Sequence, residues 1–383
     1  MSSAPNNSSR FWGICLSLSV LLALGAWWWF RPSAVPAARK APMTNVAPAV
    51  SRATTNQSPV ATNPLPVTSK TLLITKDAAA SRQRLAELSQ WLATLPPKEA
   101  VAAIRQFLDS KADAPTGQGF KIGANGALSS APTLRVFLLD QLGRLDPAAA
   151  ADYSKVILSS MDSPDEWAVA LRNLAWGDPS DEGRTLLELK TSEMLQYGPW
   201  HQNPSVGFLE AFDVAVYLGG TSLIPTLTNL VQQQDNPAVA HASYLALDRL
   251  VINNPTATLT ALLADLDLMQ GRETTRANYF ARADVSNPQQ LQILENYLLN
   301  PQISPAEINT FAGIFPNANY MISPNLLTQT QTSNHDALVS RDAASFIVVQ
   351  QWLADPRFAS LYPSLEKTEA RLAGYVQQEN RRQ

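Results

Sequence analysis

The side chains that carry most enzyme and metal chemistry are few in this chain, and their spacing is unfavourable. Its three histidines are His201, His241 and His335. None belongs to an HExxH motif, and none lies beside another at the spacing of metal ligands. The sequence therefore predicts no zinc site, and no residue pattern indicates a cofactor.

Nucleophile and nucleotide motifs are absent as well. The chain has no Gly-x-Ser-x-Gly elbow, and its single cysteine, Cys15, lies in an apolar N-terminal segment. The glycine-rich segment 117–128 has no strand pattern before its Gly-x-Gly and no Lys-Ser/Thr after it, so it does not resemble a phosphate-binding loop. Its Asn125-Gly126 pair instead predicts a small hairpin.

Paired carboxylates leave one catalytic alternative open. Asp165-Glu166 and Asp265 with Asp267 are close in sequence. A glycan-active α/α-toroid hydrolase of the cell envelope would need such a pair across a tryptophan-lined cleft. Candidate tryptophans are Trp167, Trp176 and Trp200. Asp165 and Glu166 also suit the first turn of a helix, where acids favour the dipole. We therefore predict no catalytic activity and keep the hydrolase as the alternative.

Five residues form a possible interaction surface. Tyr197, Trp200 and His201 cluster at a break in the helical pattern, where exposed aromatic residues would suit a ligand or partner. Alternatively, Trp200 fills the junction between neighbouring helices. His241 and Asp248 lie on the side of a predicted helix that is opposite its apolar face.

The elements that must position these residues are helices. From residue 71 to 383, helical patterns alternate with short breaks in which a polar cap residue precedes a proline, as at Asn203-Pro204 and Asn236-Pro237. Two breaks carry full capping boxes, Ser163–Glu166 and Ser304–Glu307, whose glutamates should reach back to the cap residue. Spacings of three and four predict helices over 206–218, 222–231 and 237–250. His335-Asp336 follows a polar run and is expected in an exposed loop.

These helices recur with a period of about 30 residues, which is typical of stacked helical hairpins. The stretch Tyr217–Leu250 resembles a HEAT-type repeat through its Leu-Gly-Gly turn, Ile224-Pro225-x-Leu227, Asn236-Pro237-x-Val239 and terminal Ala-Leu-x-x-Leu. It departs from the family where the usual arginine is Ala240. The resemblance, best over about residues 204–268, implies a scaffold with a curved interaction surface and no chemistry. A plain helical bundle is the alternative.

The N-terminal segment Phe11–Phe30 has twenty residues without charge or proline, about 30 Å as a helix. Its ends carry aromatic residues that suit a membrane interface: Phe11, Trp12, Trp27, Trp28, Trp29 and Phe30. We expect a single-pass anchor in the lipid bilayer. A leader cleaved after Ala37 and a buried core helix are the alternatives. The flanking charges lean slightly towards a cytoplasmic C-terminal side, whereas a short basic tail commonly stays inside. We expect export of the body, to the periplasm in a bacterium.

Charge and composition divide the remainder. Residues 31–70 are rich in Pro, Ala and Thr without hydrophobic periodicity, which predicts a disordered linker. Residues 1–70 contain six basic and no acidic residues, so the body carries 23 basic against 32 acidic residues, a net charge of −9. Such a body should be repelled by nucleic acid.

The predicted organisation is therefore an N-terminal tail (1–10), an anchor (11–30), a linker (31–70) and a helical-repeat domain (71–383). Its fold class is all-α, a HEAT-like α-solenoid of stacked hairpins. The predicted function is a membrane-tethered scaffold that binds a protein partner whose identity the sequence does not indicate.

Overall fold

The computed structural model describes residues 65–66, 77–233, 235–319, 322–330 and 333–381, all within one compact unit, Ala61–Gln383. The predicted anchor, Phe11–Phe30, and all of the predicted linker except residues 65–66 lie outside this described part. Within it, no helix combines the length and the apolar character needed to cross a bilayer.

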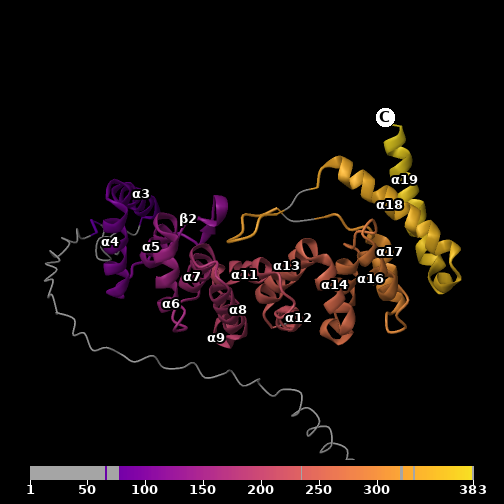
Figure 1. Ribbon diagram of the computed structural model, residues 1–383, viewed down its shortest axis with the longest axis horizontal. Helices are drawn as coiled ribbons and strands as arrows, with labels where there is room; N and C mark the ends of the chain where they lie inside the picture. The colour runs from indigo at the N-terminus through magenta and orange to yellow at the C-terminus, as the bar shows by residue number, and fades with distance from the viewer. Residues whose placement is uncertain (1–64, 67–76, 234, 320–321, 331–332, 382–383) are drawn as a thin grey trace, which may run out of the picture. The chain divides into compact units, whose positions relative to one another are not determined.

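The described part is almost entirely helical, which confirms the all-α prediction (Figure 1). The helices up to residue 218 are α3 (Ala78–Thr94), α4 (Pro97–Asp109), α5 (Leu134–Leu145), α6 (Pro147–Ile157), α7 (Pro164–Gly177), α8 (Asp181–Gln196), α9 (Gly198–Gln202), α10 (Val206–Glu210) and α11 (Asp213–Leu218). The later ones are α12 (Ile224–Gln232), α13 (Pro237–Asn253), α14 (Pro255–Ala264), α15 (Glu273–Phe280), α16 (Pro288–Leu298), α17 (Pro305–Ile314), α18 (His335–Ala354) and α19 (Tyr362–Asn380). Short 3-10 helices are η1 (Ala124–Gly126), η2 (Leu266–Met269) and η3 (Pro356–Leu361).

Proline sets the first turn of many of these helices. It stands at the start of α6, α7, α13, α14, α16 and α17, where its missing N–H has no intrahelical acceptor to lose. In both predicted capping boxes the serine hydroxyl accepts the expected amide: Ser163 from Glu166 N–H at 3.3 Å, and Ser304 from Glu307 N–H at 3.2 Å. The two glutamate side chains, however, bind buried arginines instead of reaching back to the cap residue.

Two other local expectations were wrong. The helix predicted over 206–218 is divided into α10 and α11, because the hydrogen bonds tighten across the junction: Val214 N–H donates to Ala211 O at 3.0 Å, three residues back. His335-Asp336 begins α18 and does not lie in a loop, since the Asn334 side chain caps that helix by accepting from Ala337 N–H at 2.8 Å.

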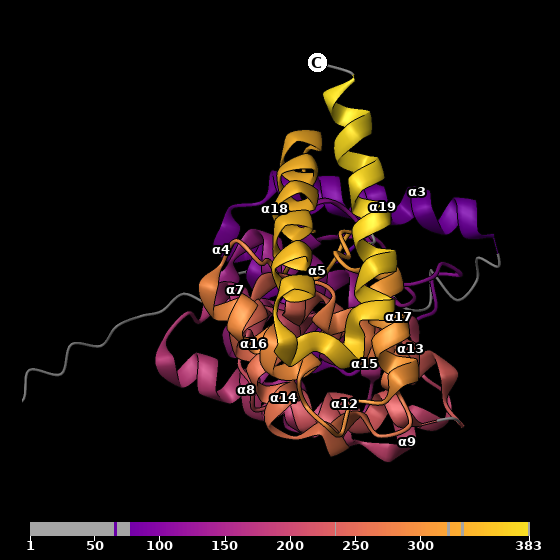
Figure 2. The same cartoon turned by 90° about the vertical axis from the view of Figure 1, so that its right-hand side faces the viewer.

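The closest packing joins helices that are near one another in the chain. Helix α5 packs against α4, α6 and α7, helix α13 packs against α11, α12 and α14, and α18 lies beside α19 (Figure 2). The core between them is apolar, with large side chains such as Trp167, Phe208 and Trp352 buried. Each helix therefore buries its apolar face mainly against the next ones along the chain.

The predicted hairpin interrupts the helices between α4 and α5. Strands β1 (Lys121–Ile122) and β2 (Leu128–Ser130) pair antiparallel. Asn125 and Gly126 have φ of 54° and 77°, the left-handed values that a type I′ turn requires at both central positions. This small hairpin is the one sheet among the described residues.

Candidate interaction site

Aspartate–arginine pairs link helices that are separated by one helix in the chain. Asp140 on α5 binds Arg172 on α7 at 2.6 Å, and Asp213 on α11 binds Arg249 on α13 at 3.1 Å. The partners are 32 and 36 residues apart in the chain. A third pair, Asp248 with Arg282, lies 34 residues apart and is bidentate at 2.5 and 2.8 Å. Similar contacts thus recur at nearly constant chain separation.

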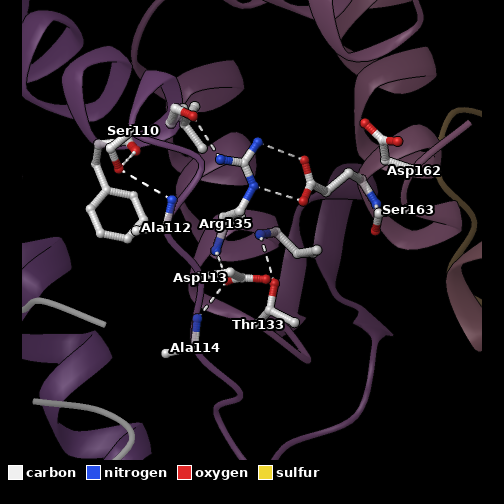
Figure 3. Close-up of polar contacts among 12 residues, drawn as sticks. Ser110, Ala112, Asp113, Ala114, Thr133, Arg135, Asp162 and Ser163 are labelled. Atoms are coloured by element: carbon white, nitrogen blue, oxygen red, sulfur yellow. Dashed lines mark hydrogen bonds and ion pairs between the residues drawn. The ribbon is translucent and has the colours of Figure 1, made fainter. Parts of the chain in front are cut away.

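A second kind of pair recurs as well. Arg135 donates to both carboxylate oxygens of Glu166 at 2.8 and 3.0 Å (Figure 3). Arg276 does the same with Glu307, at 2.8 and 2.7 Å, and both pairs span 31 residues. Each arginine also donates to a backbone carbonyl, of Leu108 and Leu266 respectively. Bidentate geometry gives these contacts direction as well as energy.

One segment departs from this neighbour-to-neighbour pattern. The return loop, which comprises the described residues 315–319, 322–330 and 333–334 between α17 and α18, reaches back towards the β hairpin (Figure 1). Asp213 holds its tip: the Oδ2 atom accepts the Leu327 N–H at 2.7 Å and the Thr328 N–H at 2.9 Å. The Thr328 hydroxyl donates to Oδ1 of the same carboxylate. Because Asp213 is 1% exposed, this contact fixes a non-helical segment of polypeptide on the surface of the helices.

The tip of the return loop packs against the β hairpin. Leu326 is fully buried, and a Cβ added at Gly126 would overlap the Leu326 carbonyl oxygen. Gly126 O in turn accepts from Arg172 at 2.8 Å, and the Leu128 N–H donates to Asp140 at 2.9 Å. The Asp140–Arg172 pair therefore positions the hairpin against which the return loop packs. We call the surface of α10, α11 and α13 under this loop the loop-bearing face.

A cavity of about 300 Å³ lies on the loop-bearing face, between α10, α13 and the return loop. Its apolar lining comes from Leu209, Ala238, Ala242, Leu245 and Ile252. Its polar side chains on the helices are Glu210, His241, Asp248, Arg249 and Asn253, and the loop adds Ser323, Asn325, Gln329 and Thr330. The cavity is therefore mainly apolar, with a few ionisable groups at its wall, as is usual for binding sites.

Two of these carboxylates lie in opposite circumstances. Asp248 is paired with Arg282, and burial raises its pKa more than the Arg282 charge lowers it. Glu210 is half-buried, and no hydrogen bond or ion pair joins its side chain to another described residue. Burial raises the Glu210 pKa, with the Arg249 charge opposing and the Asp213 charge adding to the shift. The Arg249 Nε–H is buried without an acceptor among the described residues.

The residues predicted to form an interaction surface are not one cluster. Trp200 and His201 are buried, each 8% exposed, so they do not present an exposed surface. Trp200 packs edge-on against Trp167 and Phe208, with ring centroids 5.6 and 5.9 Å apart, because α9 lies over the α7–α10 contact. Tyr197 contacts the same Trp200 ring at 5.1 Å and is partly buried.

His241 and Asp248 do share a site, since both line the cavity. His241 is exposed and stacks on Tyr244, with centroids 6.2 Å apart. Asp248 is 7% exposed, so its expected place on the solvent side of α13 was wrong. The Arg282 side chain covers it, and that residue lies beyond the helix from which the expectation was drawn.

The carboxylates considered for glycan hydrolysis have structural contacts. Asp165 accepts from the Ser205 hydroxyl at 2.6 Å and from the Gly207 N–H at 3.0 Å. Glu166 binds Arg135, and Asp265 caps η2 through the Asp267 N–H at 3.2 Å. Trp167 and Trp200 belong to the core. These groups link helices and do not converge on the cavity.

No sequence pattern indicated Asp213, Glu210 or Arg249 as residues of the site. Asp213 contacts Leu327 and Thr328 across more than 110 residues, a relation that no local pattern carries. The adjacent pair Asp248-Arg249 was a usable signal, since one residue binds forward to Arg282 and the other back to Asp213. Compared with known proteins, the chain matches no family model, no curated protein and no solved structure.

Proposed function

We propose that this protein is a membrane-tethered, HEAT-like helical-repeat scaffold that binds an extended segment of another protein on its loop-bearing face. The single observation that carries the proposal is the return loop itself. Its tip is a non-helical polypeptide segment bound to the helices through two backbone N–H groups and one hydroxyl on Asp213, with Leu326 buried. A surface that binds such a segment within its own chain has the chemistry to bind one from a partner.

The repeated pairs support the scaffold part of the proposal. Asp140–Arg172 and Asp213–Arg249 join helices at chain separations of 32 and 36 residues, and Asp248–Arg282 joins α13 to the turn after α15 at a separation of 34 residues. A regular separation of this kind is expected when similar hairpins stack in register. The HEAT-type pattern of Tyr217–Leu250 covers the middle of the same region.

Charge indicates the kind of partner. The body carries a net charge of −9, and the cavity wall contains Glu210, whose side chain is paired with no described residue. Opposite charge speeds encounter and excludes like-charged competitors. We therefore expect a basic segment in the partner, and no nucleic acid.

The tether rests on the N-terminal sequence. The apolar segment Phe11–Phe30 and the basic, proline-rich linker would hold the body within reach of the bilayer on its extracytoplasmic side. Alkaline carbonate extraction of whole membranes should leave the intact chain in the pellet, and N-terminal sequencing should find residues preceding Ala37. A mature chain that begins after Ala37 and is released by carbonate would contradict the tether.

Photo-crosslinking in intact cells tests the interaction. A photoreactive amino acid is placed at Ile322 or Gln329 of the return loop, which lies over the loop-bearing face, and at the exposed Val156 and Leu189 on α6 and α8 as controls. We expect the same discrete product from both loop positions and none from the controls. Mass spectrometry should map the link to a lysine- or arginine-containing segment of one protein. Equal products from all four positions would contradict a specific face.

A further inference from the structure

The lining of the cavity on the loop-bearing face indicates the kind of group that it binds. Its floor is apolar, formed by Leu209, Ala242, Leu245 and Ile252 from two helices. Its volume of about 300 Å³ accommodates an alkyl chain of several carbons. A peptide backbone alone would leave this apolar lining without a partner, so the expected occupant is a side chain with a long methylene stem.

The charges around the cavity decide the sign of the group at the end of that stem. Asp248 is neutralised by Arg282, and Arg249 by Asp213. Glu210 is the wall carboxylate that no described residue pairs. A half-buried carboxylate without a donor is costly, and a cation that enters beside it removes that cost. An anion in the same place would face Glu210 and is disfavoured.

The geometry points to a primary alkylammonium group as the ligand of this cavity, supplied by a lysine side chain of the protein partner, with its methylenes on the α10–α13 floor and its ammonium on Glu210. This inference rests on the proposed function and names the anchor residue of that partner. Lysine fits better than arginine, because its uninterrupted stem of four methylenes covers more of the apolar lining than the three methylenes of arginine.

The test uses the full chain in detergent and the side-chain analogue n-pentylammonium as the probe. Ligand-observed NMR titrations compare it with n-pentanol, pentanoate and n-butylguanidinium, the matching analogue of arginine. We expect the ammonium to bind at least about tenfold more tightly than the alcohol and pentanoate to show no binding, and the guanidinium to bind more weakly than the ammonium. Equal binding of the ammonium and the alcohol would overturn the inference, and tighter binding of the guanidinium would overturn the choice of lysine.

Three variants connect the result to the cavity. Glu210→Gln should weaken ammonium binding to the level of the alcohol, while Glu182→Gln, an exposed residue at the start of α8, should change nothing. Ala238→Leu, at an exposed position of the lining, should fill the cavity and weaken all apolar probes. Unchanged ammonium binding in Glu210→Gln would overturn the inference. Circular dichroism confirms that each variant is folded.

The two proposals fail separately. If the partner still crosslinks at Gln329 but the ammonium shows no dependence on Glu210, the lysine anchor is wrong and the scaffold function stands. If the ammonium binds through Glu210 and no partner crosslinks, the scaffold function is wrong. The assignment of the ammonium to a lysine of a protein partner is then wrong as well.

Discussion

The Asp213 carboxylate accepts the backbone N–H of Leu327 at 2.7 Å, although 114 residues separate the two in the chain. The same carboxylate receives Arg249 and Thr328, so one buried side chain joins α11, α13 and the return loop. Since Asp213 is 1% exposed, these donors replace water as its partners. The bound loop and the pairing of neighbouring helices therefore depend on one residue.

Asp213→Ala should destabilise the fold by about 3–5 kcal/mol, because it leaves the Arg249 charge partly buried without its partner. Chemical denaturation measures the loss, and limited proteolysis should show new cleavage near Leu327. Asp152→Ala, at an exposed position of α6, should change stability by no more than about 0.5 kcal/mol. A similar small effect at Asp213 would contradict its assigned role.

Gly126→Ala should release the loop tip without touching Asp213. At a φ of 77°, a residue with a Cβ destabilises the fold by about 1–2 kcal/mol relative to glycine. The new Cβ would also overlap the Leu326 carbonyl oxygen. Gly119→Ala is the matched control, since its Cβ would meet no atom within 4 Å. We expect faster proteolysis of the return loop in the first variant alone. Equal cleavage of both variants would show that the hairpin does not hold the tip.

The two arginine–glutamate pairs should differ in their cost of disruption. The Glu307 side chain is fully buried and also accepts from the Tyr297 hydroxyl at 2.8 Å, whereas that of Glu166 is 11% exposed. Glu307→Gln should therefore cost about 3–5 kcal/mol and Glu166→Gln less, as measured by urea unfolding. The opposite order would contradict the burial argument, and Glu182→Gln sets the baseline.

Glu210 should make the stability depend on pH in a particular direction. Burial raises its folded-state pKa above the ordinary 4.5, so between that value and the raised one the folded state holds more protons than the unfolded state. Stability from this group is therefore complete below pH 4.5 and falls as pH rises through the folded pKa. The charged or titratable groups around it are Arg249, Asp213, Asp248 and His241.

Glu210→Gln should remove the loss of stability that the Glu210 charge causes as the pH rises. Denaturation midpoints measured across pH should show the variant close to the wild type near pH 4 and more stable than it at pH 7. Subtracting the two curves isolates Glu210, because the other groups are common to both proteins. A variant that is less stable than the wild type at pH 7 would show that the Glu210 charge has a favourable partner in the folded chain.

Much of the helical fold could be predicted from local signals. Pairs of a polar residue and a proline marked the first turns of α6, α13 and α16. Asp146 and Asn287 cap α6 and α16 through side-chain hydrogen bonds, whereas Asn236 makes no such bond at α13, where only the fixed φ of Pro237 acts. The glycine-rich segment likewise predicted the hairpin through Asn125-Gly126. These features depend on neighbours in the chain.

The site could be predicted only in part, because long-range contacts define it. Periodicity assigned Asp248 to the solvent side of α13, but Arg282 covers it. The capping-box pattern assigned Glu166 to its own helix start, but Arg135, 31 residues earlier, offers a charged bidentate partner that a neutral amide cannot match. The sequence predicted His241 as a site residue, and it does line the cavity. No sequence pattern indicated Glu210, which only the structure places in the cavity wall.

Hydrogen–deuterium exchange of the intact chain tests the central claim most directly, because it reports whether the loop-bearing face holds the tip of the return loop. The account predicts that the Leu327 and Thr328 amides exchange as slowly as amides in the middle of α13, and that Asp213→Asn removes this protection. Exchange of these two amides at the rate of an unfolded segment in the wild-type chain would contradict the claim.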